Sequence, residues 1–224
     1  MAGDDARIPR PPAARLGPPA PWLRLPAASR RPTLADVRRT CKALPTPRRP
    51  LTNIPGMQGA AVLAPFFADD DGLARVILTT RPDTMPSHRG DVAFPGGKFH
   101  PELDRHLLDA ALREAEEEIG LHRSAVEVVG ELDTLSTITT RFLVAPFIGV
   151  LRHRPVLIPH PEEVAAVFDL ALADLLADGV HREEYWGISG ISRSVHFFEL
   201  DDQVIWGVTA RILASFLMLL TATG

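Results

Sequence analysis

One segment of the chain, residues 97–121, reads as a glycine turn followed by a single acidic helix. Its apolar residues recur at helical spacing, which predicts one buried stripe and excludes the alternation of a half-buried strand. A glycine follows the stripe and ends the helix, as glycine commonly does at a helix C-terminus. The stripe consists of Leu108, Ala111, Leu112, Ala115 and Ile119, and the terminating glycine is Gly120.

Three glutamates of this helix, Glu114, Glu117 and Glu118, are three or four residues apart and are therefore neighbours on its surface. Like charges so placed repel by roughly 0.2–0.5 kcal/mol per pair, a cost that a bound cation would remove. Carboxylate oxygens are hard ligands that suit Mg²⁺ or Mn²⁺. A solvated acidic face is the simpler interpretation of such a run, and the entry to the helix is what favours a metal site.

The helix is entered from residues 94–98, Phe-Pro-Gly-Gly-Lys, which read as a strand end that turns through two glycines. Glycine lets the backbone approach a metal ion or a phosphate closely. Together with residues 113–121 this entry resembles the Nudix box, whose second half is Arg-Glu-apolar-x-Glu-Glu-x-Gly-apolar. That second half matches at every specified position.

The first half of the box departs from the family pattern. The interval from Gly97 to Arg113 is two residues longer than in the pattern, and Arg105 stands where the pattern has glutamate. We expect Asp104 to replace that loop carboxylate. The resemblance implies an α/β fold, a Nudix-type α/β/α sandwich with a mixed β-sheet, and Mg²⁺ or Mn²⁺ as cofactor. The implied metal ligands are the side chains of Glu114, Glu117, Glu118 and Asp104 and the backbone carbonyl of Gly97.

A second segment, residues 78–97, leads directly into the box. It resembles the additional signature of the coenzyme A diphosphatase branch of this family, in which Leu-Leu-Thr-x-Arg precedes His-x-Gly and then Phe-Pro-Gly-Gly. Residues 205–210, Ile-Trp-Gly-Val-Thr-Ala, resemble the start of the C-terminal helix of that branch. The resemblance covers about residues 56–220. It implies cleavage of the diphosphate bond of coenzyme A or a derivative, giving 3′-phosphoadenosine 5′-phosphate and 4′-phosphopantetheine or acyl-phosphopantetheine.

The substrate contacts that this branch implies are Arg81, His88 and Arg89. Arginine suits such a role because its planar fork matches phosphate oxygens. Lys98 stands beside the two glycines and is a further candidate for phosphate contact, with a solvated loop lysine as the alternative.

Hydrolysis of a phosphoanhydride needs charge neutralised and a water molecule positioned, and metal ions supply both. Three residues are candidates for the general base: Glu117, Glu118 and, from outside the box, Glu163. Arg113 can pair with Glu117 one turn along the helix and orient it. The expected catalytic set is therefore Glu117, Glu118 and Arg113.

Two other classes of function stay open. One is a Nudix hydrolase of a different substrate, such as ADP-ribose, a dinucleotide or a nucleoside triphosphate, which a substrate panel would separate. The other is a non-catalytic binding module on the same scaffold. Such a module would be expected to lose its box glutamates, which this chain keeps, although the altered loop leaves this class open.

The length of 224 residues suits one domain with extensions. The single cysteine, Cys41, excludes an internal disulfide framework and fits a reducing compartment, so we expect a cytoplasmic location. The apolar run at residues 212–220 is too short for a membrane span and predicts a buried terminal helix. A net charge of −4 gives no general attraction to nucleic acid. We expect a small-molecule partner, without nucleic acid or membrane; the sequence leaves the oligomeric state open.

Charge and proline are concentrated at the start of the chain. Residues 1–50 hold 11 of the 21 prolines, and 11 Arg or Lys against 3 Asp, a net charge of +8 that leaves −12 for the rest. We expect residues 1–32 to be a disordered or extended arm. A basic arm that binds nucleic acid or a membrane is an alternative. Residues 33–50 should form a short helix, capped by Thr33, and a linker, and residues 51–224 the Nudix domain.

Periodicity and turn residues place the remaining elements. Strands are predicted at residues 59–66, 74–79, 126–132, 142–151, 164–170, 195–200 and 203–206, with an acidic hairpin tip at residues 69–72. A helix should pass through Leu176 and end by Gly179, and another should close the chain. Strands interleaved with helices predict an α/β domain.

Overall fold

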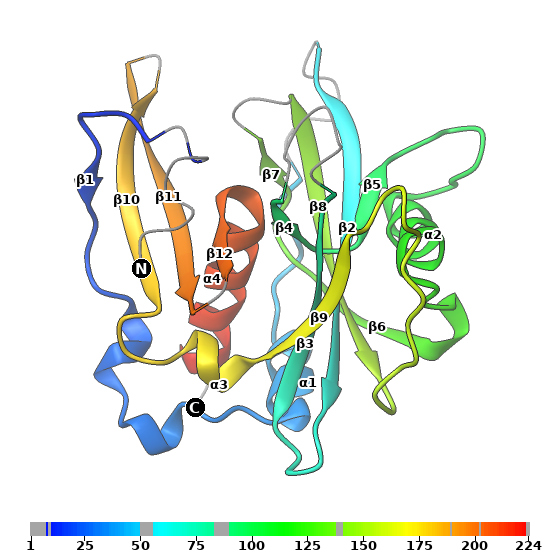
Figure 1. Ribbon diagram of the computed structural model, residues 1–224, viewed down its shortest axis with the longest axis horizontal. Helices are drawn as coiled ribbons and strands as arrows, with labels where there is room; N and C mark the ends of the chain where they lie inside the picture. Colours follow the sequence, from blue (N-terminus) through cyan, green and yellow to red (C-terminus); the bar gives the residue numbers. More distant parts are fainter. Residues whose placement is uncertain are drawn as a thin grey trace.

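The computed structural model of the protein describes residues 8, 10–49, 56–82, 90–137, 141–188, 190–201 and 203–222. This part of the chain forms successive layers, seen edge-on in Figure 1. A four-stranded sheet is followed by helix α4 (Gly207–Ala222), an eight-stranded sheet and helix α2 (Leu107–Ile119). The glutamates predicted to bind metal lie on α2.

The larger sheet has mixed strand direction. Its central strand β2 (Gln58–Ala68) pairs in parallel with β8 (Phe142–Leu151) and antiparallel with β3 (Ala74–Thr80). All its other pairings are antiparallel. They involve β4 (Val92–Ala93), β5 (Gly96–Lys98), β6 (Val126–Glu131), β7 (Leu135–Ser136) and β9 (Ala166–Ala171).

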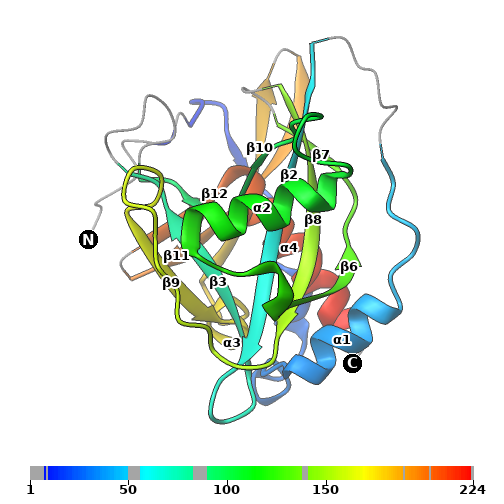
Figure 2. The same cartoon turned by 90° about the vertical axis from the view of Figure 1, so that its right-hand side faces the viewer.

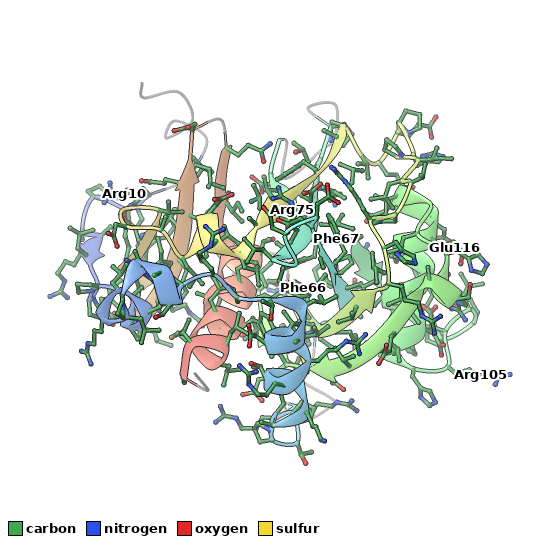
Figure 3. The ribbon with its side chains drawn as sticks, turned by 90° about the horizontal axis from the view of Figure 1, so that it is seen from below. Arg10, Phe66, Phe67, Arg75, Arg105 and Glu116 are labelled. Carbon is green, nitrogen blue, oxygen red and sulfur yellow. The ribbon has the colours of Figure 1, made fainter. Side chains whose placement is uncertain are left out.

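Helices cover both faces of the larger sheet. Consecutive residues of a strand point to opposite sides, so apolar side chains emerge on both faces and each face needs a cover. Phe66 and Phe67 of β2 show this in Figure 3: Phe66 belongs to the core shared with α4 and α1 (Leu34–Lys42), and Phe67 to the core under α2. Helix α2 crosses the front of the sheet in Figure 2. The predicted α/β/α sandwich with a mixed sheet is confirmed.

The smaller sheet packs on the opposite side of α4. Its antiparallel order is β1 (Arg15–Leu16), β10 (His181–Ile188), β11 (Ile191–Leu200) and β12 (Gln203–Trp206). The strands β11 and β12 were predicted, and β10 was not. The short helical turns are η1 (Pro21–Arg24), η2 (Ala27–Ser29), η3 (Arg123–Ala125) and α3 (Leu172–Leu175).

Part of the segment 10–32 packs against the smaller sheet, whereas the sequence predicts a disordered or extended arm over residues 1–32, of which residues 1–7 and 9 lie outside the described residues. The side chain of Trp22 is 1% exposed and lies against the rings of Phe198 and His181. Arg10 pairs with the fully buried Glu184, and β1 extends the sheet beyond β10. Burial of a tryptophan and of an ion pair fixes this segment despite its many prolines.

Ion pairs join the positively charged residues 1–50 to the negatively charged remainder of the chain. Arginines of the first 50 residues face acidic residues of the domain, with N···O distances of 2.7–2.8 Å. These arginines are therefore paired with acidic residues of the same chain. The pairs are Arg10–Glu184, Arg30–Asp178, Arg38–Glu127, Arg48–Asp133 and Arg49–Glu131.

The predicted N-cap of α1 and the predicted terminal helix agree with the structure, whereas α3 ends at Leu175, before the predicted passage through Leu176. Thr33 caps α1 in a capping box: its Oγ1 accepts from Asp36 N–H at 3.3 Å, and Asp36 Oδ2 accepts from Thr33 N–H at 2.8 Å. Helix α4 buries Ile212, Phe216 and Leu220, as expected of a terminal core helix. Within the described ranges, no helix has both the length and the apolar character needed to span a bilayer.

Candidate metal and phosphate site

The site forms where β5 crosses the middle of α2. A side chain at Gly97 would displace Glu114, because a Cβ there would lie 2.4 Å from the carboxyl carbon of Glu114. Gly96 has a φ of 151°, and a Cβ there would lie 2.4 Å from the carbonyl oxygen of Ala61. The two glycines thus bring the backbone directly against the acidic face of the helix.

Glu118 is the most buried glutamate of the site, at 7% exposure, and its Oε2 accepts from Gly96 N–H at 3.0 Å. The pKa of Glu118 is raised to about 7, chiefly by burial and also by the charges of Glu114 and Glu163, against the opposing effects of Gly96 N–H and Arg81. Burial also raises the pKa of Glu114. Carboxylates desolvated beside like charges are stabilised in their ionised form by a cation.

Arg113 holds two glutamates of α2 in place. Its Nη1 donates to Oε1 of Glu114 at 2.8 Å and to Oε2 of Glu117 at 2.9 Å. Its Nη2 also donates to the carbonyl oxygen of Lys98 at 3.2 Å, which links the helix to β5. The predicted pairing of Arg113 with Glu117 is confirmed.

Asp104 faces the same guanidinium. Nε and Nη2 of Arg113 each donate to one Asp104 oxygen at 3.0 Å, and His100 N–H donates to Oδ2 at 2.9 Å. The hydrogen bonds from Arg113 hold the pKa of Asp104 below its usual range. Arg105 points outward at the rim of the molecule in Figure 3, so Asp104 is the loop carboxylate that reaches α2. Its predicted role as a metal ligand stays a prediction.

Two charged residues outside α2 shift the pKa values of its glutamates. Arg81 follows β3 and lowers the pKa of Glu118, and its buried Nε has no hydrogen-bond partner among the described residues. Glu163 raises the pKa of both Glu114 and Glu118. It lies in the loop after β8, which is anchored to α2 by a 2.8 Å bond from His160 N–H to the carbonyl oxygen of Glu118.

The other predicted substrate contacts have different outcomes. The ammonium of Lys98 lies 5.7 Å from the centre of the Phe142 ring on β8, and its side chain is exposed. His88 and Arg89 lie outside the described residues. Of the predicted substrate contacts in the described part, Arg81 is therefore the one that interacts with the glutamate cluster.

The chemistry of the site fits a hard divalent cation. In the residues that the structure describes, no three His, Cys, Asp or Glu side chains converge as a preformed metal site. Arg113 and Gly96 N–H occupy oxygens that a metal would take. Three glutamates on one helix, the bare backbone of Gly97 and the raised pKa values nevertheless suit Mg²⁺ or Mn²⁺. Glu117, whose side chain is 56% exposed, can leave Arg113 with little cost in packing.

Two cavities lie elsewhere. One, of about 700 Å³, is lined by residues 124–127 and 150–155, and another, of about 220 Å³, lies beside Phe67, Ile77 and Phe168. Neither is lined by a glutamate of α2, so the charged groups rather than the cavities identify the site.

The sequence did not predict the contact between Trp206 and Asp91. Nε1–H of Trp206 donates to Oδ1 of Asp91 at 3.1 Å and so joins the C-terminal motif to the segment that precedes the box. The two residues are 115 positions apart, and no spacing rule connects them. Their occurrence in two motifs of the same branch was the one available hint.

The NUDIX domain family matches residues 57–186 of the chain. Nudix hydrolase 22 of Arabidopsis thaliana, named as chloroplastic, is 45% identical over 161 residues, covering 69% of this chain and 52% of the plant protein. The chain thus spans about half the length of this relative. The uncharacterised Nudix hydrolase NudL of Yersinia enterocolitica is 37% identical, covering 69% of this chain and 77% of that protein. The crystal structure of RenU, a Nudix hydrolase from M. smegmatis, is similar with a TM-score of 0.44 and 22% identity, covering 53% of this chain and 73% of that one.

Proposed function

Because the chain belongs to the Nudix hydrolase family, we propose that it hydrolyses the diphosphate bond of coenzyme A or of a coenzyme A derivative, with Mg²⁺ or Mn²⁺. Arg81 carries this proposal. It is the described arginine of the coenzyme A signature, it interacts with Glu118, and its buried Nε lacks a partner among the described residues. A guanidinium with a free donor beside carboxylates that bind a cation suits the oxygens of a diphosphate.

In this proposal the cation is held by Glu114, Glu117, Glu118 and the carbonyl of Gly97, where it would neutralise phosphate charge and acidify a bound water. Arg113 would keep Glu114 oriented, because it also donates to the carbonyl oxygen of Lys98 on β5. Gly96 N–H fixes one oxygen of Glu118 and leaves the other available.

The reaction adds water across the P–O–P linkage. The attacking oxygen forms a bond to one phosphorus and loses a proton, while the bridging oxygen leaves with the other phosphate. Glu118 is a candidate for the proton-accepting role, because Gly96 N–H fixes only one of its two oxygens. Glu117 and Glu163 remain alternative bases, and Glu163 approaches from a separate loop.

Product analysis with coenzyme A and Mg²⁺ tests the proposal. The expected products are 3′-phosphoadenosine 5′-phosphate and 4′-phosphopantetheine, with EDTA and Glu117→Gln as inactive controls. A higher kcat/KM on ADP-ribose, a dinucleotide or a nucleoside triphosphate would instead assign another Nudix substrate. Tight binding of these compounds without any turnover would indicate a binding module. Fractionation of the source cells tests the proposed cytoplasmic location, since two plant relatives are named as chloroplastic and mitochondrial.

A further inference from the structure

A side-chain hydrogen bond links the smaller sheet to the segment that leads into the site. Trp206, the last residue of β12, donates from Nε1 to Oδ1 of Asp91 at 3.1 Å. Strand β12 lies beside β4 at this point, as Figure 1 shows. The bond therefore links an edge strand of the smaller sheet to an edge strand of the larger one.

Asp91 in turn fixes the backbone of Arg81. Its carbonyl oxygen accepts from Arg81 N–H at 3.0 Å, and the carbonyl oxygen of Arg81 accepts from Gly90 N–H at 3.1 Å. These bonds continue the β3–β4 ladder, in which Thr80 is paired with Val92. Arg81 thus occupies the last rung of a short ladder, where its position depends on where Asp91 is held.

The segment that contains Asp91 continues to Gly96, which contacts Glu118. After Asp91 the chain passes through β4 and the buried Phe94 to Gly96, whose N–H donates to Glu118. A shift of Asp91 would move Arg81 directly, since the two are bonded. It would be damped before Gly96, because Phe94 is 3% exposed and Pro95 accepts a 2.9 Å bond from Leu63 N–H.

Trp206 is itself held firmly. Its ring lies 6.5 Å from that of Trp186, which is 4% exposed, and it packs on the core cluster that contains Phe197 and Ile8. An indole fixed by packing presents its N–H in one direction, so it can set the position of the carboxylate that accepts from it.

We propose that Trp206 is a positioning residue for substrate binding: by holding Asp91 it places the guanidinium of Arg81 at the phosphate of the substrate. The inference rests on the proposed function in one respect, that Arg81 contacts a substrate phosphate. It gives the smaller sheet a part in substrate binding although Trp206 itself touches no reacting group.

Trp206→Phe removes the N–H and keeps an aromatic ring. The matched control is Trp186→Phe, which keeps an aromatic ring against Trp206 and removes a 2.8 Å bond to Glu184, on the side of the sheet that pairs with Arg10. Trp206→Phe should raise KM for coenzyme A about fivefold, the factor of one ordinary hydrogen bond, with kcat changed by less than about twofold. Trp186→Phe should leave KM unchanged, although both variants melt at a lower temperature.

Variants of Asp91 test whether the effect passes through this bond. Asp91→Asn keeps an oxygen that can accept from Trp206 and should retain a near-normal KM, whereas Asp91→Ala should raise it. Combining Asp91→Ala with Trp206→Phe should give no further rise beyond Asp91→Ala alone, because coupled residues are non-additive. Additive increases would mean that the two residues act separately and would overturn the proposal.

Hydrogen exchange supplies a readout that does not depend on activity. Exchange of Arg81 N–H, which bonds to Asp91, should be about fivefold faster in Trp206→Phe than in Trp186→Phe. Equal exchange in the two variants together with an unchanged KM would overturn the inference. If the protein does not cleave coenzyme A, the proposed function fails, while KM on the substrate that it does cleave and the exchange comparison still decide the role of Trp206.

Discussion

Arg113 bonds carboxylates of three residues, Asp104, Glu114 and Glu117, and so offsets the repulsion along the acidic face of α2 before a metal binds. The sequence predicted its pair with Glu117, because residues four apart on a helix are neighbours. It did not predict the pair with Asp104. A loop two residues longer than the family pattern offers no fixed register from which side-chain directions can be inferred.

Glu117→Gln should reduce turnover by at least about a hundredfold, the scale lost when a positioned electrostatic or acid–base group is removed. The side chain of Glu117 is 56% exposed, so the melting temperature should change little. Steady-state kinetics at saturating Mg²⁺, with thermal unfolding alongside, measure both. Full activity of this variant, or of the wild type in EDTA, would contradict a metal site on α2.

Asp104→Asn should raise the Mg²⁺ concentration needed for half activity by about 10–100-fold. The expectation holds for a direct ligand, and also for a partner of Arg113 whose loss lets the guanidinium bind Glu114 and Glu117 more tightly. Glu102→Gln is the control, because Glu102 is exposed and contacts the ring of His100. Metal titration of the two variants side by side decides the matter: a larger effect of Glu102→Gln would reassign the loop carboxylate.

At the scale of elements, the sequence predicted the C-terminal end of α2 at Gly120 and both ends of β8. Apolar periodicity and a terminating glycine are local signals, and these elements follow them. Strand β10 escaped prediction because charged residues occupy its covered face. Glu184 is fully buried there and is paired with Arg10 and Arg182, a partnership between distant segments that no local pattern reveals.

Gly97→Ala tests the fit between β5 and α2. The added Cβ would lie 2.4 Å from the carboxyl carbon of Glu114 and must displace it, so we expect at least about a tenfold loss of kcat/KM and a destabilisation of about 1–3 kcal/mol. Gly187→Ala in β10 is the matched control, since no atom lies within 4 Å of the added Cβ. Comparable losses in both variants would show that strand conformation, rather than contact with Glu114, is responsible.

At the scale of the whole molecule, residues 10–49 are part of the folded body. Proline content and positive charge predicted a loose arm over residues 1–32, and both signals are compositional. The structure instead buries Trp22 and Arg30, each at 7% exposure or less, and directs the arginines to acids of the domain. Ion pairs between residues so far apart in the sequence follow from the folded structure and from no local pattern.

Global stability should fall in mild acid because of two histidines of the smaller sheet. His181 Nε2 lies 3.1 Å from Nδ1 of His196, and burial lowers the pKa of His181 from 6.5 to about 4. Between these values the unfolded chain binds the proton and the folded chain does not, so stability decreases as pH falls from 7 toward 4. Allowing for partial solvent exposure, we expect His181 to account for a loss of about 1 kcal/mol between pH 7 and 5.

Urea unfolding at the two pH values measures this loss. His181→Phe keeps a ring against Trp22 and should flatten the pH dependence, whereas substitution of the exposed His153 should not. An unchanged slope in His181→Phe would place the acid sensitivity elsewhere.

The short strand β1 lies along the outer edge of β10, where Gly17 N–H also donates to the carbonyl oxygen of Glu183 at 2.8 Å. An uncovered edge presents unpaired backbone groups that recruit strands from other molecules. Proteolytic removal of residues 1–17 should therefore turn a monodisperse preparation into one that self-associates along β10, so the arm also serves as protection against aggregation.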